Sequence, residues 1–348
     1  IMHKAISVIQ FKLEEQLITR RSEFDIGHRK MLSNIDYSKG EIQLEGKTYE
    51  LKDSWFPTID PSDPVALSKE EEDLVSQLSE SFQQSSRLKK HVQFLFEKGS
   101  MYHIANDCLL FHGSIPINAK GDLTEVDLLG KKLKGKAYMD FLDKLAREAF
   151  SGVLGTAEND LAVDMMWYLW AGPESPLFGK DKMTTFERYF IKDTSLHKET
   201  KSHYYDYRDD SETSRKILKD FQLDPENSII INGHVPVAVK KGESPIKADG
   251  KLIVIDGGFA KAYQDQTGIA GYTMIFDDHG KQIIAHLPFE STKKAIEEEV
   301  DILSNETLYS YSEKTLQVSD IKDGDPIKEL IRDLKELLQC YRSGILTE

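Results

Sequence analysis

Two short apolar runs, each ending at a histidine beside a glycine, constrain the fold more than any other feature of this chain. Residues 109–111 lead into His112, and residues 228–232 lead into His234. Apolar runs of this length, bounded by turn residues, predict buried strands. Each strand would place an imidazole at the rim of a sheet, and imidazole nitrogen is a common ligand of transition-metal ions. Pattern alone leaves a second interpretation open, in which each histidine is a surface or hydrogen-bonding residue.

Helices and further strands surround these two runs. Helical spacing of apolar residues predicts helices over residues 1–35, from Ser68 to Phe96, over 134–170, and through the last 50 or so residues. Ser68 followed by three glutamates is typical of an N-cap with an acidic first turn. Further strands are predicted at 42–51 (a hairpin), 251–256, and 271–276 with its return over 282–287. The pattern indicates an α/β fold.

Composition excludes several classes of protein. The 348 residues are 39% hydrophobic and 30% charged, which is an ordinary balance for a globular chain. The net charge of −14 opposes binding to nucleic acid or to an anionic membrane, and no apolar run reaches the length of a membrane span. Two distant cysteines, Cys108 and Cys340, indicate no disulfide framework. We therefore expect a cytoplasmic protein that binds neither nucleic acid nor membrane.

Several long strings resemble one enzyme family along nearly the whole chain. They are residues 2–14, Phe56-Pro57-Thr58-Ile59-Asp60, residues 169–190 and residues 250–264. Together with the two histidine elements they resemble class 3 fructose-1,6-bisphosphatases, which belong to the calcineurin-like metallophosphatases. The resemblance implies hydrolysis of the C1 phosphate of fructose 1,6-bisphosphate, a reaction of gluconeogenesis and carbohydrate metabolism.

The resemblance also implies a dinuclear metal centre, usually of manganese, with His112 and His234 as ligands of one ion. Such enzymes carry Asp-x-His, Gly-Asp-x-x-Asp-Arg-Gly and Gly-Asn-His-Asp elements as well. The last two do not occur in this chain, and the first occurs only at residues 277–279, within a predicted hairpin turn. Two histidines without a bridging carboxylate cannot offset the repulsion between two divalent ions. We therefore expect an incomplete metal centre and catalytic residues that lie elsewhere.

Two segments supply candidates for substrate binding. Residues 170–188 resemble a loop from which related phosphatases supply an arginine to phosphate, which favours Arg188 and then Lys180. The paired glycines after the strand at 251–256 could admit an anion near Lys261, and Tyr263 matches a tyrosine of related enzymes. In the other interpretation, these cations only solvate a loop and the glycines only form a turn.

The resemblance implies a β-sandwich core with flanking helices, incomplete in this chain. Residues 1–103 would be a mostly helical insertion, 104–295 the C-terminal half of the core, and 296–348 a helical appendage. The first residue, Ile1, is not a methionine, which we interpret as a hint of a longer protein. We expect a missing N-terminal half, without which the chain is inactive, and a homo-oligomer.

Two alternatives to this function stay open. The chain could belong to a calcineurin-like phosphatase that acts on another sugar phosphate or on a phosphoprotein. It could instead be a non-catalytic remnant or binding subunit from a split gene, since the aspartate-bearing elements are absent. The residues do not decide the metal's identity, the oligomeric state or any effector.

Overall fold

The fold was determined as a computed structural model, which describes residues 2–258, 260–299, 304–311, 315, 317–320 and 324–346. It divides into two compact units, described here one at a time. One unit comprises Ile1–Met101 and Ser114–Tyr205, and the other comprises Tyr102–Gly113 and Asp206–Glu348. We refer to them as the helical unit and the sheet unit.

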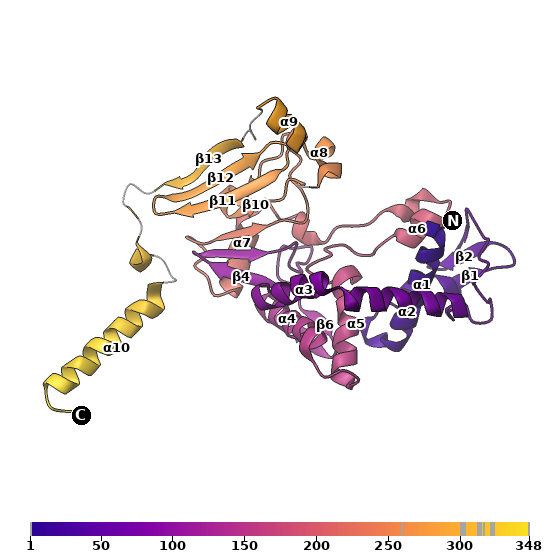
Figure 1. The fold of residues 1–348 in the computed structure, drawn as a ribbon, viewed down its shortest axis with the longest axis horizontal. Coiled ribbons are helices and arrows are strands. Elements are labelled where there is room, and N and C mark those ends of the chain that lie inside the picture. Colours follow the sequence, from indigo (N-terminus) through magenta and orange to yellow (C-terminus); the bar gives the residue numbers. More distant parts are fainter. Residues whose placement is uncertain are drawn as a thin grey trace. The chain divides into compact units, whose positions relative to one another are not determined.

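The sheet unit is built on a mixed five-stranded sheet with the strand order β4-β5-β8-β10-β9 (Figure 1). Strands β5, β8 and β10 are parallel neighbours, and β4 and β9 pair antiparallel at the edges. Helix α7 packs on β8 through apolar side chains that include Ile217 and Leu218. These elements are β4 (Tyr102–Ala105), β5 (Cys108–Phe111), α7 (Ser211–Asp220), β8 (Ile229–Asn232), β9 (Ile246–Lys247) and β10 (Leu252–Val254).

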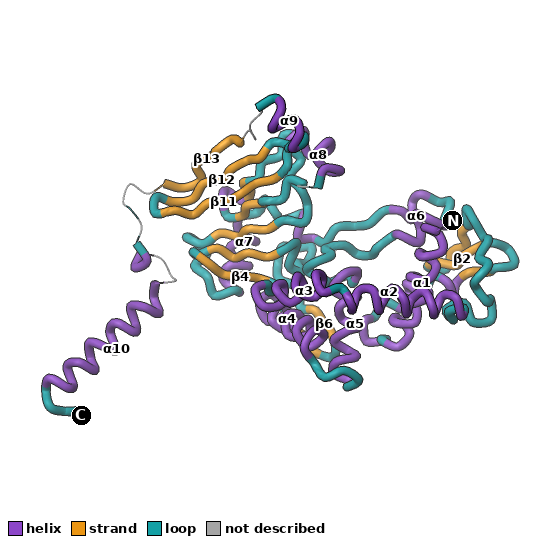
Figure 2. The backbone as a smooth tube through the Cα atoms, viewed as in Figure 1, coloured by secondary structure: helices purple, strands orange, loops and turns teal. Residues whose placement is uncertain are grey.

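A second, antiparallel sheet of the same unit has the order β11-β12-β13 (Figure 2). The Tyr272 N–H donates to the Ile255 carbonyl over 3.2 Å, and the Tyr309 hydroxyl donates to the Gly250 carbonyl, so this sheet is bonded to the segments on either side of β10. The remaining elements are α8 (Lys261–Thr267), β11 (Gly271–Asp277), β12 (Gly280–His286), α9 (Thr292–Glu297), β13 (Ser304–Tyr311) and α10 (Asp325–Arg342).

The helical unit is centred on α1, whose residues Val8 and Phe11 pack into a core with Phe186 and Phe190. Helices α4 and α5 pack against each other around Tyr138, which has no solvent exposure. The elements are α1 (Met2–Arg20), β1 (Ile35–Asp36), β2 (Glu41–Leu44), β3 (Lys47–Glu50), α2 (Lys69–Gln84), α3 (Ser86–Lys98), β6 (Val126–Leu128), β7 (Lys131–Leu133), α4 (Gly135–Ser151), α5 (Ala157–Ala171) and α6 (Thr185–Phe190).

Two helical expectations are wrong in part. The helix predicted over residues 1–35 ends at Arg20, because the buried Glu15 carboxylate accepts from the Leu32 N–H over 2.8 Å and holds the following segment against α1. The tail predicted as helical from residue 296 contains strand β13, which pairs antiparallel with β12. Helix α10 confirms the rest of that expectation, and the mixture of helices and sheets confirms the α/β class.

The two units also divide the chain differently from the predicted boundaries, because residues 102–113 lie in the sheet unit and the chain then returns to the helical unit until Tyr205. No helix in the described part of the chain is both long and apolar enough to cross a bilayer.

A buried ion pair ties α1 to the start of α2. The Lys12 ammonium has no solvent exposure and donates to the Glu71 carboxylate over 2.7 Å and to the Thr58 carbonyl over 2.6 Å. Glu71 also accepts from the Ser68 N–H and so completes a capping box at the predicted N-cap of α2. One carboxylate therefore stabilises both a helix end and a buried cation.

Replacing Glu71→Ala should lower the free energy of unfolding by about 3 kcal/mol or more, because it leaves the Lys12 ammonium buried without a counter-ion. Glu72→Ala is the matched control, since Glu72 is exposed and its carboxylate pairs, among the described residues, only with Lys69 at 3.7 Å, a pair worth about 0–1 kcal/mol. Urea denaturation of both variants measures the difference. Equal destabilisation would contradict the role given to this ion pair.

Candidate functional site

The parallel pairing of β5, β8 and β10 gathers three side chains at one edge of the sheet. In register, Leu110 lies opposite Ile231, and Val254 lies opposite Asn232. Residues that follow the carboxyl ends of adjacent parallel strands meet at the same edge, where open α/β sheets commonly bind ligands. His112, His234 and Asp256 occupy these positions.

The two predicted ligands, His112 and His234, are brought together. His112 Nε2 lies 2.9 Å from His234 Nδ1, and the rings meet edge to face with their centroids 4.9 Å apart. One imidazole must donate and the other must accept, so at least one of the two is neutral. Burial lowers the pKa of His112, more than the nearby Asp256 carboxylate raises it. A neutral imidazole is the form that binds metal.

The backbone holds this pair in an unusual conformation. His234 has a φ of +66°, in the left-handed region that non-glycine residues rarely adopt. The preceding Gly233 donates its N–H to the His112 carbonyl over 2.9 Å, which fixes the two turns against each other. Strained backbone of this kind occurs preferentially at functional sites, because the surrounding structure must hold it in place.

The donor atoms partly fit the metal centre that the resemblance implies. When two imidazole nitrogens bind one metal ion side by side, with metal–nitrogen bonds of about 2.1 Å, the nitrogens lie about 3 Å apart. The distance of 2.9 Å between His112 Nε2 and His234 Nδ1 is close to this spacing. Among the described residues, however, no group of three or more histidine, cysteine, aspartate or glutamate side chains could enclose an ion. The two histidines can therefore supply part of a coordination sphere.

Asp256 and the glycines after it form a tightly packed loop. Asp256 Oδ1 accepts from the Gly258 N–H over 2.9 Å, so this carboxylate orients the loop. A Cβ on Gly257 would lie 2.6 Å from the Gly271 Cα, and Gly258 has a φ of +84°. Both glycines are thus required by packing and conformation alone.

Two predicted substrate-binding residues follow this loop. The Tyr263 side chain is 54% exposed, at the start of α8. The side chain of Lys261 lies outside the described part of the structure. Neither prediction is tested by the geometry of the loop.

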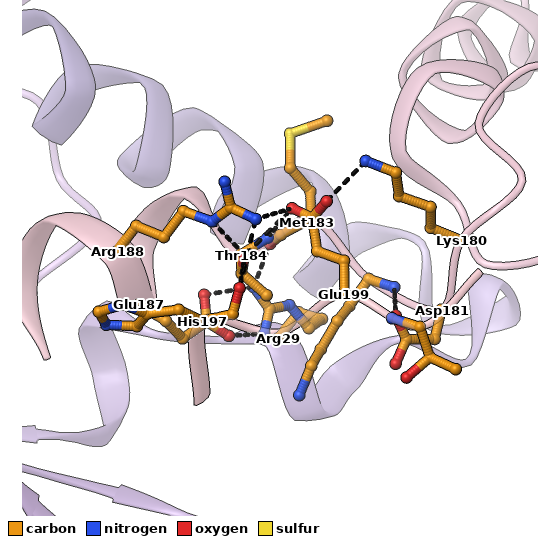
Figure 3. Close-up of polar contacts among 11 residues, drawn as sticks. Arg29, Lys180, Asp181, Met183, Thr184, Glu187, Arg188, His197 and Glu199 are labelled. Carbon is orange, nitrogen blue, oxygen red and sulfur yellow. Dashed lines mark hydrogen bonds and ion pairs between the residues drawn. The ribbon is translucent and has the colours of Figure 1, made fainter. Parts of the chain in front are cut away.

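The other two predicted substrate-binding residues, Lys180 and Arg188, converge on a residue that sequence reasoning missed. Lys180 Nζ lies 2.6 Å from Glu199 Oε2, and Arg188 Nη2 lies 3.6 Å from Glu199 Oε1. The two cations approach this one carboxylate from different sides (Figure 3). The group therefore carries one positive charge in excess.

Buried Thr184 connects the members of this cluster. Its N–H donates to Glu199 Oε1 over 3.1 Å, and its hydroxyl accepts from Arg188 Nε over 3.0 Å. A second guanidinium nitrogen of Arg188, Nη2, donates to the His197 carbonyl over 3.2 Å. Within the described residues, Nη1 of this half-exposed guanidinium contacts no acceptor, so it can still bind an anion.

Glu199 remains ionised in this setting. Burial would raise the pKa of its carboxyl group, but hydrogen bonds from Lys180 and from the Thr184 N–H outweigh burial and hold the pKa below the ordinary value. Nothing in the sequence around Glu199 marked it, because its partners lie between 11 and 19 residues away.

Comparisons with known proteins agree on one family. The family described as Firmicute fructose-1,6-bisphosphatase matches residues 1–343. Class 3 fructose-1,6-bisphosphatases of Clostridium tetani, Clostridium botulinum and Bacteroides fragilis are 52%, 51% and 49% identical to the chain over 347 residues. Each alignment covers 100% of this chain and 52% of the relative, so the chain spans about half the length of these curated relatives. No solved structure matches the chain.

The Glu199→Gln variant should be less stable than the parent by about 1–2 kcal/mol near neutral pH, because Lys180 and Arg188 lose their shared charge partner. The folded pKa of Glu199 lies below its ordinary value, so its contribution is complete above that value and is lost as the pH falls through the folded pKa.

Urea denaturation at several pH values should therefore show a gap between parent and variant that closes towards pH 3. Glu50→Gln removes an exposed partner of Lys192 and serves as the control. A gap that does not change with pH would contradict the assignment.

Proposed function

Since the chain belongs to the Firmicute fructose-1,6-bisphosphatase family, we propose that it forms part of an enzyme that hydrolyses the C1 phosphate of fructose 1,6-bisphosphate. The products are fructose 6-phosphate and inorganic phosphate, and the reaction serves gluconeogenesis in the cytoplasm. The observation that carries the proposal is the pair of facing imidazoles, His112 and His234, at the carboxyl edge of a parallel sheet.

We propose that these two histidines hold one ion of a dinuclear manganese centre. Such a centre supplies Lewis acidity for the attack of water on phosphorus. Burial lowers the pKa of His112, which favours the neutral imidazole that a metal binds, and the strained backbone at His234 places the second imidazole against the first. The remaining ligands, including a bridging carboxylate, would come from the part of the relatives' length that this chain does not span.

This division implies that the chain corresponds to the C-terminal portion of the enzyme and is inactive alone. The absence of any group of three metal-binding side chains among the described residues supports this proposal. We further propose that Arg188, Lys180, Lys261 and Tyr263 bind the substrate. The charge excess around Glu199 supports this assignment for the first two.

Phosphate release from fructose 1,6-bisphosphate with Mn²⁺ tests the proposed activity. We expect turnover only when this chain is joined to, or mixed with, the remaining half of a full-length class 3 enzyme. In that active protein, His234→Ala should lower kcat at least about 100-fold, because one imidazole of the centre is lost.

The His279→Ala variant is the control, since His279 lies in the exposed hairpin turn between β11 and β12. Full activity of this chain alone would contradict an incomplete centre. Equal activity on phosphopeptides or on other sugar phosphates would instead favour a phosphatase of different substrate specificity.

Replacing Arg188→Met should raise KM for fructose 1,6-bisphosphate by about 10-fold or more, because a charged hydrogen-bond donor to phosphate is removed. Lys192→Met is the matched control, since Lys192 pairs only with Glu50 in the described part of the chain. Steady-state kinetics of the active protein gives both values. An unchanged KM in the Arg188 variant would remove this residue from the substrate site.

A further inference from the structure

A pocket in the helical unit has chemistry that neither the metal centre nor the substrate residues explain. It is enclosed by α1, α5 and the segments 26–31 and 181–186, and we call it the α1–α5 pocket. Its volume is about 40 Å³, which exceeds the roughly 10–15 Å³ that one water molecule needs. A small ligand group could therefore enter it.

The lining of the pocket includes basic residues besides the acids Glu14 and Asp181. It carries His28, Arg29 and Lys182. The carboxylate of Glu187 pairs with Arg29, whose Nη2 also donates to the Met183 carbonyl over 2.7 Å (Figure 3). Lys182, in contrast, has no ion-pair partner within the described residues.

The charges of Arg29 and Lys182 also act on the pKa of His28. Partial burial, followed by the charges of Arg29 and Lys182, lowers the pKa of His28, and these effects outweigh the opposing charges of Glu45 and Asp25. Because Arg29 is paired with Glu187, Lys182 is the cation acting on this imidazole that has no ion-pair partner in the described part of the chain. An anion at the same place would relieve this repulsion.

The interior of the pocket offers hydrogen-bond donors. Trp167 Nε1 is buried and has no acceptor with hydrogen-bond geometry in the described part of the chain, although it lies close enough to Glu14 to favour its ionised form. Burial nevertheless raises the pKa of Glu14, despite Trp167, Arg29 and a 2.8 Å hydrogen bond from Gln10.

The other acid on the lining is already occupied. Asp181 is exposed, and its Oδ1 accepts from the Lys182 N–H over 2.9 Å and from the Thr200 N–H over 2.7 Å. The Asp181 carboxylate is therefore hydrogen-bonded to backbone N–H groups. An unpaired buried donor such as the Trp167 indole costs about 1–3 kcal/mol, which an acceptor atom of a ligand would recover.

We propose that the α1–α5 pocket binds a compact oxyanion, the carboxylate or phosphate group of a small molecule, through Lys182, His28 and the Trp167 indole N–H. A cationic ligand would meet the Lys182 ammonium, and a wholly apolar ligand would leave the indole N–H unpaired. This proposal is independent of phosphatase activity, because it concerns binding to the chain as it stands.

Nuclear magnetic resonance of the His28 imidazole tests the proposal directly, with His28→Asn used to assign the signal. The chain is titrated with inorganic phosphate, with acetate and with chloride at constant ionic strength. Phosphate or acetate should shift the signal saturably and raise the pKa of His28, while chloride should not. Whichever of the two ions saturates at the lower concentration identifies the preferred oxyanion.

Two variants connect the signal to the pocket. Lys182→Met should weaken binding at least about 5-fold, and Lys182→Gln should do the same if the first variant folds poorly. Lys192→Met, which removes an exposed lysine outside the pocket lining, should leave the dissociation constant within about 2-fold. Identical shifts with chloride, or undiminished binding in both Lys182 variants, would overturn the proposal.

Discussion

The parallel pairing of β5, β8 and β10 is the constraint on which the candidate metal site depends. Strand β5 precedes β8 and β10 by more than 100 residues, and all three strands must align their carboxyl ends before His112, His234 and Asp256 can meet. The backbone bond from the Gly233 N–H to the His112 carbonyl then joins two of the turns. The sheet therefore fixes how the two imidazoles meet, and it also holds His234 in its strained backbone conformation.

In the helical unit, buried or half-buried carboxylates organise the chain in a similar way. Glu71 holds Lys12, Glu15 holds the Leu32 N–H, and Glu199 holds Lys180 together with Arg188. Each carboxylate satisfies several donors at once, which offsets the cost of removing its charge from water. The cations around Glu199 are left only partly compensated, and Lys182 on the lining of the α1–α5 pocket has no ion-pair partner among the described residues.

Sequence patterns located most of the regular elements because their causes are local. The serine and glutamates at 68–72 predicted the start of α2, and the apolar runs predicted β5 and β8. Prediction failed where a distant partner decides the conformation. Glu15 ends the first helix early by binding the backbone at Leu32, and pairing with β12 makes residues 304–311 a strand. Glu199 was missed because no periodicity or motif marks a residue that acts through side chains 11 to 19 positions away.

The sequence by itself determined the family, the α/β class and the two histidines at strand ends. These features depend on motifs and on short-range periodicity, both of which involve only residues close together in the chain. Only the tertiary structure decided that His112 and His234 face each other at 2.9 Å, and that Lys180 and Arg188 share one carboxylate. The histidine contact joins residues 122 positions apart, and the contacts with Glu199 span 19 and 11 positions. The α1–α5 pocket joins segments more than 100 positions apart. Such distances are fixed by strand register and packing, which no local pattern encodes.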